Sequence, residues 1–381
     1  MTDNLTAVGR RLRLAGRNAM NQWGKRDDML VHETEPFNAE PSPVALARAV
    51  ITDVDTFYSR NHGPVPDVDP DAWRLTVVGL VDQPLTLSLA ELRERFEQHS
   101  LLATLQCAGN RRSGFLKVRD IPGEDPWESG ATSTARWTGV RLADVLLAAG
   151  IRPEAAHVAF AAPDRSELAD PPQTYGGSIP AAKALSGETL LAWAMNDEPL
   201  TPLHGAPVRV VVPGWIGARS VKWVERITVQ AEPSDNYFQA TAYRVLPPDA
   251  DPRQAGPGDG ISLGAVALNS AILEPADGAQ VTAGKLDVTG YAFAGDDRGV
   301  ARVDVSVDGG ETWSQADLVA QPSPWAWCQW RANVQVEAGQ VEIVARAWDT
   351  TAALQQESAR ELWNPKGYVN NSWPRIHVHS T

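Results

Sequence analysis

The segment 247–260, PPDADPRQAGPGDG, is the feature that most constrains how this 381-residue chain can fold. Its proline, glycine and aspartate residues disfavour both helix and strand, which predicts a linker between two domains. Before it, short apolar runs are mixed with helical patterns. After it, runs such as 286–291 (LDVTGY) and 302–307 (RVDVSV) alternate apolar and polar residues, as half-buried strands do. The sequence therefore predicts an α+β first domain and an all-β second domain.

The same shifts in composition divide the chain into four parts. We expect a leader over 1–30, a first domain over 31–246, the linker over 247–260 and a second domain over 261–381. The second domain is expected to be a sandwich of immunoglobulin-like size, with a hairpin turn at Asp308, Gly309 and Gly310 before a strand around Trp313. A chain of this length is sufficient for two domains of ordinary size.

Local patterns in the first domain predict individual elements. Ser88 is a plausible N-cap for a helix over 89–97, and a helix over 141–150 ends at a glycine. Short apolar runs predict buried strands. These runs lie at 73–78, 101–106, 156–161 and 208–212.

Charge, hydropathy and cysteine content exclude several classes of protein. The chain has 47 acidic and 34 basic residues, a formal net charge of −13, which argues against a nucleic-acid partner. Its apolar runs are too short to cross a membrane. Arg10 and Arg11 are followed by polar residues, so we reject an export signal. Two distant cysteines imply no disulfide framework, and a cytoplasmic location is expected.

Residues 104–112, TLQCAGNRR, place Cys107 at the end of an apolar run and shortly before Arg111 and Arg112. Nearby positive charge stabilises a thiolate, so a depressed pKa is expected for this thiol. The residues alone allow a metal ligand, a catalytic nucleophile or a buried structural thiol.

Five further motifs surround this one. They are FYSRNHGPVP at 57–66, PWESGATSTARWTGV at 126–140, TYGGSIP at 174–180, HGAPVRVVVPGWIGARSVKW at 204–223 and NSAILEPADGAQVTAG at 269–284. In this order and at these separations, the chain from about residue 55 onward resembles the sulfite oxidase family of molybdenum enzymes. The resemblance implies a molybdopterin cofactor and molybdenum, with Cys107 as the protein ligand to the metal.

The resemblance also implies a set of cofactor-binding residues. Arg209 is the one that residue chemistry supports best, because an arginine in the apolar run PVRVVVP needs an anionic partner. Asp164 competes with Asp170 for the aspartate position. The full set is Tyr58, Ser59, Arg60, Asn61, His62, Cys107, Asp164, His204, Arg209, Ser220, Val221 and Lys222.

A second set of residues is implied for a small oxyanion substrate. Arg60 and Arg112 match the family's anion ligands, Trp127 lines the pocket, and Tyr175 offers a phenol. Family members that oxidise sulfite carry a further arginine near the stretch matching 322–330. Here that stretch has none, and the nearest is Arg331; Cys328 within it is expected to be a core residue.

The resemblance predicts oxidation of sulfite to sulfate by oxo transfer, in a homodimer formed through the second domain. Residues 367–378 resemble the family's terminal strand. No haem module is visible in the sequence, so electrons are expected to go to a small redox protein or to dioxygen. Alternatives are nitrate reduction or another small-molecule oxo transfer on the same scaffold, hydrolysis by Cys107 with His62 or His204, and a non-catalytic cofactor carrier or adhesion module.

Overall fold

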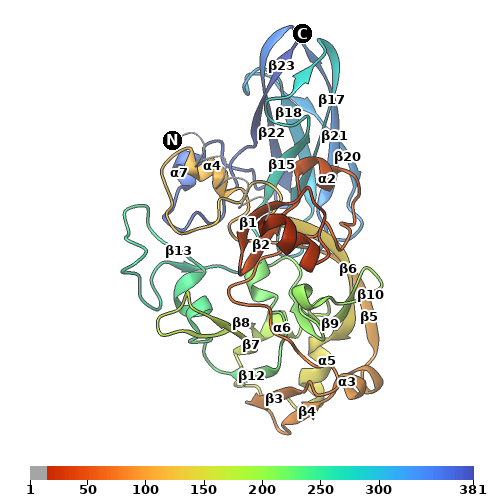
Figure 1. Ribbon diagram of the computed structural model, residues 1–381, viewed down its shortest axis with the longest axis vertical. Coiled ribbons are helices and arrows are strands. Elements are labelled where there is room, and N and C mark those ends of the chain that lie inside the picture. Colours follow the sequence, from red (N-terminus) through yellow and green to blue (C-terminus); the bar gives the residue numbers. More distant parts are fainter. Residues whose placement is uncertain (1–14) are drawn as a thin grey trace.

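The computed structural model describes residues 15–381. Arg10 and Arg11, on which the argument about export depended, lie outside these residues. Within the described range, no helix combines the length and apolar character that crossing a bilayer requires. The chain is built mainly from strands, with a β-sandwich at one end and a mixed part at the other (Figure 1).

Two five-stranded sheets form the mixed part. The first has the order β10-β9-β6-β5, and β11 also pairs with β9. Its strands are β5 Gln98–Gln106, β6 Thr132–Arg141, β9 Leu190–Met195, β10 Glu198–Pro199 and β11 Arg209–Val211. The second has the order β4-β3-β12-β7-β8, in which β12 runs parallel to β3. Its strands are β3 Leu75–Gly79, β4 Leu85–Leu87, β7 His157–Ser166, β8 Gln173–Pro180 and β12 Arg226–Gln230.

Short helices connect these sheets. The helix predicted from Ser88 is confirmed as α3 Leu89–Arg95, and Ser88 and Glu91 form a reciprocal capping box at its start. The helix predicted over 141–150 is α5 Leu142–Ala148, and Gly150 follows it with φ +70°. The others are α2 Pro43–Ala47, α4 Arg112–Leu116, α6 Ala181–Ala184, the 3₁₀ turns η1 Pro202–His204 and η2 Gly217–Arg219, and the π-helical turn η3 Phe238–Ala242.

The predicted all-β second part is a sandwich of two sheets. One sheet has the order β15-β17-β21-β20 and the other β16-β23-β22-β18-β19. Along β21, alternate residues from Cys328 to Val336 are buried between the sheets, which is the alternation visible in the sequence. The strands are β15 Asn269–Glu274, β16 Gln280–Val281, β17 Gly284–Phe293, β18 Val300–Ser306, β19 Ser314–Gln315, β20 Asp317–Ala320, β21 Cys328–Val336, β22 Gly339–Asp349 and β23 Arg375–Ser380. The short helix α7 Ala359–Leu362 lies between β22 and β23 in the chain.

The sandwich and the mixed part share buried contacts. Tyr291 and Trp327 of the sandwich belong to the same apolar cluster as Leu75 and Val210 of the mixed part. The Trp327 backbone N–H donates to Thr104 Oγ1 at 2.8 Å. Residues 363–372, between α7 and β23, run back over the mixed part, so both parts contribute to the pocket described below.

Two further segments close the fold. Residues 15–22 are helical, and Ala19 and Met20 pack with Phe37 and Leu203 beside the hairpin of β1 Leu30–Thr34 and β2 Phe37–Glu40. The segment 247–260 is an irregular loop whose ends are held together by β13 Arg244–Val245 and β14 Ile261–Ser262. The Arg244 guanidinium donates to three carbonyl groups of this loop, so the loop folds back on itself.

Candidate functional site

The candidate site begins at the end of β5, where the strand stops at Gln106 and the chain turns. Cys107 is buried, and its backbone N–H donates to Ala131 O at 2.9 Å. The backbone N–H of Gly109 donates to Cys107 Sγ at 3.4 Å. Arg111 then takes a left-handed conformation, φ 64°, before α4 begins. This turn presents the thiol at the wall of a cavity.

The expectation of a depressed pKa for this thiol is wrong for the cofactor-free protein. Burial raises the pKa of Cys107, and the nearby charges of Arg112 and Arg60 offset only part of that effect. Arg111 gives little help because its guanidinium turns away and donates to Ser372 O at 2.7 Å. Cys107 is a free thiol in this fold.

The cavity beside Cys107 has about 650 Å³ of empty volume, counted to the open solvent at its mouth. One wall is the predicted segment around Arg60. Ser59 pairs through its backbone with Ala39, at 2.8 and 3.0 Å, and the Asn61 N–H donates to Asn38 Oδ1 at 2.6 Å. Strand β2 therefore holds this segment in place, in addition to the prolines that follow it.

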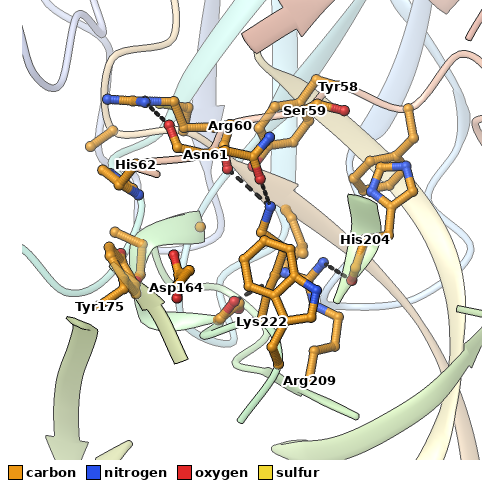
Figure 2. Close-up of a pocket in the computed structure, with 18 of the residues that line it drawn as sticks. Tyr58, Ser59, Arg60, Asn61, His62, Asp164, Tyr175, His204, Arg209 and Lys222 are labelled. Carbon is orange, nitrogen blue, oxygen red and sulfur yellow. Dashed lines mark hydrogen bonds between the residues drawn. The ribbon is translucent and has the colours of Figure 1, made fainter. Parts of the chain in front are cut away.

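The opposite wall comes from η1, β11 and the turn after η2 (Figure 2). Arg209 donates to His204 O and to Ser220 O, both at 3.0 Å, and its guanidinium lies 5.0 Å from the Trp137 ring centroid. Lys222 Nζ donates to Arg60 O at 3.2 Å and to Asn61 Oδ1, which joins the two walls.

Most predicted cofactor-binding residues line this cavity. They are Tyr58, Ser59, Arg60, Asn61, His62, Cys107, Asp164, His204, Arg209, Ser220 and Lys222. Val221 lies between two of them with its side chain buried, and its backbone carbonyl accepts from Val210 N at 2.8 Å. Asp164 is buried at the cavity wall, whereas its competitor Asp170 is exposed.

The electrostatics of the cavity favour an anionic ligand. Burial lowers the pKa of Arg209 to about 10. Burial, followed by repulsion from Arg209, holds the pKa of Lys222 well below its usual value. His62 and His204 also have strongly lowered pKa values, first because they are buried and then because cations surround them. Buried cations in this number are costly unless a ligand anion neutralises them.

Unsatisfied polar atoms give independent support for a ligand here. Ser59 Oγ and Asp164 Oδ1 are buried without a hydrogen-bond partner within residues 15–381. Burial raises the pKa of Asp164 to about 7, against the opposing charge of Lys222. A pterin offers N–H groups to such acceptors, and its phosphate tail offers a dianion to the cations. The residues present therefore fit molybdopterin, with Cys107 available as a soft metal ligand.

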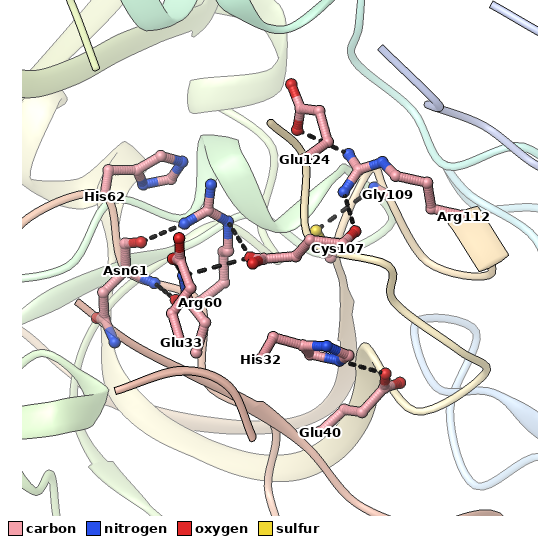
Figure 3. Close-up of polar contacts among 12 residues, drawn as sticks. His32, Glu33, Glu40, Arg60, Asn61, His62, Cys107, Gly109, Arg112 and Glu124 are labelled. Atoms are coloured by element: carbon pink, nitrogen blue, oxygen red, sulfur yellow. Dashed lines mark hydrogen bonds and ion pairs between the residues drawn. The ribbon is translucent and has the colours of Figure 1, made fainter. Parts of the chain in front are cut away.

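Arg60 and Arg112 flank Cys107 on its other side (Figure 3). The Arg112 side chain is buried and is fixed by Asp125 O at 2.7 Å and Lys366 O at 3.1 Å. It also forms an ion pair with Glu124 at 3.2 Å. Arg60 lies 3.9 Å from the Asp125 carboxylate. Both predicted anion ligands thus have a carboxylate beside them.

Arg60 also lines a second, outer cavity of about 1290 Å³ of empty volume that adjoins the first. Residues from several distant parts of the chain meet there. They include Glu33, His62, Glu124, Asp125, Tyr243, Lys366 and Tyr368. Arg331 is not a pocket residue, because it is exposed on β21 and pairs with Asp287 of the neighbouring strand. Lys366 and Tyr368 are therefore the second-part groups at this opening.

The resemblance implied that Trp127 lines the substrate pocket and that Tyr175 offers a phenol there; both side chains are buried. Trp127 is fully buried, and its ring meets His32 edge-on at a centroid distance of 4.6 Å. Tyr175 lines the inner cavity and stacks on His62 at 4.5 Å, but its hydroxyl donates to Ala218 O at 2.8 Å. Cys328 is buried in the sandwich core, as predicted.

Sequence reasoning missed Tyr243, which lines both cavities. Its hydroxyl lies 2.5 Å from His62 Nε2, and its neighbours include Arg60, Cys107 and Arg112. Burial raises its pKa, so the phenol is protonated at neutral pH. The aromatic run NYFQATAY just before the linker was the available signal. Lys366 and Tyr368 had no such signal in the sequence, because they lie near the C-terminal end of the chain and reach the site only through tertiary packing.

Two family models match the chain. Residues 62–238 match the oxidoreductase molybdopterin binding domain, and residues 262–381 match the Mo-co oxidoreductase dimerisation domain. The sulfite oxidase of Arabidopsis thaliana is 38% identical, in an alignment that covers 92% of this chain and 94% of that protein. The mitochondrial sulfite oxidase of Rattus norvegicus is 43% identical over 91% of this chain, but the chain spans only 65% of its length.

Two other matches bear on the choice of reaction. A nitrate reductase of Hordeum vulgare is 38% identical over 93% of this chain and 42% of its own length. The solved structure of the sulfane dehydrogenase SoxCD from Paracoccus pantotrophus superposes with a TM-score of 0.77 at 26% identity, covering 91% of this chain and 86% of the other. The fold and the cofactor-binding domain are therefore common to several oxidations and reductions.

Proposed function

The chain belongs to the sulfite oxidase family of molybdopterin-dependent oxidoreductases, and from that premise we propose that it oxidises sulfite to sulfate and passes the electrons to an external acceptor. The balanced reaction is sulfite plus water giving sulfate, two electrons and two protons. The position of Cys107 is the observation that carries the proposal. Its thiol lines the cation-rich inner cavity, Arg60 lines both cavities, and Arg112 pairs with Glu124 of the outer-cavity wall.

Different residues of the site bind the cofactor, its metal and the substrate. Arg209, Lys222 and Ser220 hold the anionic tail of the cofactor, and Cys107 binds its metal. When bound, the molybdenum centre supplies the oxygen atom and accepts two electrons. Arg60 and Arg112 attract the oxyanion and fix its orientation, because planar guanidinium groups match oxyanion geometry.

Tyr243 and His62 transfer the protons in this proposal. The imidazole of His62 is neutral, because burial and Arg60 hold its pKa low, and its Nε2 shares a hydrogen bond with the Tyr243 hydroxyl. A protonated phenol beside a neutral imidazole can donate one proton and receive another. We assign to Tyr243 the role that the motif had suggested for Tyr175.

The wider organisation is part of the same proposal. Residues 31–246 form the catalytic part, the loop 247–260 connects the two parts, and residues 261–381 form a homodimer, as the dimerisation-domain match supports. The electron acceptor is a small redox protein or dioxygen. A cytoplasmic location is supported by two cysteines that stay unpaired in the fold.

Purified protein loaded with molybdopterin tests the proposal. We expect about one molybdenum per chain and sulfite-dependent reduction of an artificial acceptor. Nitrate-dependent oxidation of a reduced dye, run with the same preparation, tests the alternative that the nitrate reductase match keeps open. Turnover of nitrate without turnover of sulfite would reverse the assignment.

The variant Cys107→Ser tests the metal ligand within the same assay. The substitution changes one buried atom, so the fold and the melting temperature should be preserved while sulfite oxidation is lost. Cys328→Ser is the matched control, because that thiol lies in the sandwich core. Full turnover in Cys107→Ser would remove the basis of the proposal.

A further inference from the structure

Lys25 is a buried cation that none of the sequence motifs identifies. It follows the helical residues 15–22 and is 7% exposed. Its ammonium donates to Val54 O at 2.6 Å and to Phe57 O at 2.8 Å, and it lies 2.8 Å from His204 Nε2. These contacts use all three N–H donors of the ammonium group. The N-terminal segment is thereby attached to the back of a residue that lines the inner cavity.

This contact determines the state of His204. While Lys25 is charged its ammonium group can only donate, so Nε2 accepts and the neutral ring carries its hydrogen on Nδ1. Burial, followed by the charges of Lys25, Lys222 and Arg209, keeps the pKa of His204 far below its usual value. His204 is therefore neutral, and while Lys25 is charged it stays in one tautomer, with Nδ1–H as the donor it can offer.

The charge around Lys25 is not balanced by its direct contacts. Its three acceptors are neutral groups, and Asp55 is the carboxylate that opposes the effect of burial on it. On the cavity side of His204 lie the cations Arg209 and Lys222, with Asp164 as their acidic neighbour. An anion bound in the cavity would be stabilised by all three cations, because the interior screens charge poorly.

We propose that Lys25 is a positioning residue for the cofactor: it fixes His204 in one tautomer and adds positive charge behind it, so that residues 15–29 help to retain the phosphate tail of molybdopterin. The inference depends on molybdopterin binding and not on the identity of the substrate. It holds equally for an enzyme that oxidises sulfite and for one that reduces nitrate.

The competing explanation is that Lys25 only anchors the N-terminal segment. The two roles predict opposite effects of Lys25 on the stability of the cofactor-free protein. A purely structural lysine stabilises the protein whether or not the cofactor is present. A positioning lysine is costly in the cofactor-free protein, where a buried charge lacks its anion, and favourable once the anion is bound.

Lys25→Gln and Lys25→Met test this difference, with Arg26→Gln as the control. Glutamine removes the charge and keeps amide donors, and methionine matches the unbranched shape of lysine. Arg26 is the adjacent cation, but it pairs with Asp28 at the surface. For each variant the release rate of molybdopterin from the loaded protein and the melting temperature of the cofactor-free protein are measured.

We expect both Lys25 variants to release molybdopterin roughly tenfold faster than the control, the size of effect that one charged contact gives. The melting temperature of cofactor-free Lys25→Gln should equal or exceed that of the control. Release at the control rate would overturn the proposal. So would a clear loss of cofactor-free stability, or a failure of both Lys25 variants to fold while Arg26→Gln folds.

A spectroscopic measurement on His204 gives a second readout. With ¹⁵N-labelled histidine, the chain offers seven side chains to resolve, and His204→Gln assigns the relevant signal. Below pH 7, where Lys25 is charged, the cofactor-free wild-type protein should show His204 with its hydrogen on Nδ1. Lys25→Met should show a mixture of tautomers or a higher pKa for His204, and an unchanged spectrum would exclude the proposed positioning.

Discussion

At the scale of single residues, Tyr175 and Tyr243 of the inner cavity differ in where their hydroxyl groups point. The Tyr175 hydroxyl donates to a backbone carbonyl, whereas the Tyr243 hydroxyl meets His62 at 2.5 Å on the side of Arg60. Tyr243→Phe should therefore lower kcat/KM for sulfite about 10- to 100-fold, the cost of losing a hydrogen bond to a charged reacting group. Steady-state kinetics on the loaded enzyme measures this.

Tyr175→Phe is the matched control, because it removes the same atom from a phenol in the same cavity. It should lose the bond to Ala218 O and a little stability, with kcat/KM changed less than about threefold. The opposite ranking of the two variants would return the proton-transfer role to Tyr175, as the TYGGSIP motif had suggested.

Glu124 is a second residue whose effect can be isolated. Its carboxylate pairs with Arg112 at 3.2 Å and with Lys366 at 3.5 Å, and so reduces the positive charge available to an incoming oxyanion. Arg112 keeps its bonds to Lys366 O and Asp125 O without Glu124. Glu124→Gln should therefore lower the KM for sulfite and the inhibition constant of sulfate about 3- to 10-fold.

Glu167→Gln provides the comparison for Glu124. Glu167 also lines the outer cavity, but it is exposed and pairs with Arg165. Its removal should leave both constants nearly unchanged, and inhibition by sulfate at several salt concentrations checks both variants. If Glu124→Gln instead raised the KM, the carboxylate would be supporting Arg112 rather than competing with the substrate.

At the scale of elements, the segment 363–372 between α7 and β23 sets the position of Arg112. Gly367 has φ +60°, and an added Cβ would lie 2.6 Å from Arg112 Cγ and 2.8 Å from its Nε. Gly367→Ala should push the guanidinium out of place. We expect the KM for sulfite to rise roughly tenfold while molybdopterin content stays normal.

Gly278→Ala separates this contact from backbone strain. Gly278 has φ +80°, but an added Cβ there would meet no atom within 4 Å. Both substitutions should cost about 1 kcal/mol of stability, because a side chain in the left-handed region is strained. A similar rise in KM in both variants would show that the effect comes from general destabilisation.

Elements with local signals were predictable from the sequence. Ser88 and Glu91 three residues later specify the start of α3, and the alternation in 286–291 and 302–307 specifies β17 and β18. The segment 363–372 had no such signal. Its contact with Arg112 joins residues 254 apart in sequence, and no periodic pattern encodes a contact of that kind.

At the scale of the whole molecule, the pocket is assembled from parts that are distant in sequence. The CAGNRR and RNH motifs predicted the centre of the site because each is a short, contiguous turn. Lys25, Tyr243 and Lys366 come from the N-terminal segment, the end of the mixed part and the C-terminal segment. Tertiary packing brings these residues to the site, within the mixed part for Lys25 and Tyr243 and between the two parts for Lys366.

The buried cations also give the whole molecule a pH dependence. In the cofactor-free protein burial lowers the pKa of Lys25 from 10.5 to about 7, and burial also holds the pKa of Lys222 well below its usual value. The unfolded chain therefore binds more protons than the folded one between pH 7 and 10, so stability rises with pH in that window. Asp164 has the opposite effect on stability between pH 4 and 7. Its pKa is raised to about 7, so the folded chain binds more protons than the unfolded one there, and stability falls as pH rises.

Melting temperatures between pH 7 and 8.5 test this linkage, because the cysteine and tyrosine groups with raised pKa values titrate above that range. The cofactor-free protein should melt at a higher temperature at pH 8.5, each lysine adding at most ~1.4 kcal/mol per pH unit. Lys25→Met should reduce this increase in melting temperature with pH, because it removes one of the two lysines. Bound molybdopterin should also reduce it, because an anion in the cavity raises the pKa of the lysines toward that of the unfolded chain. An identical pH slope in cofactor-free and loaded protein would mean that the bound anion does not reach these lysines.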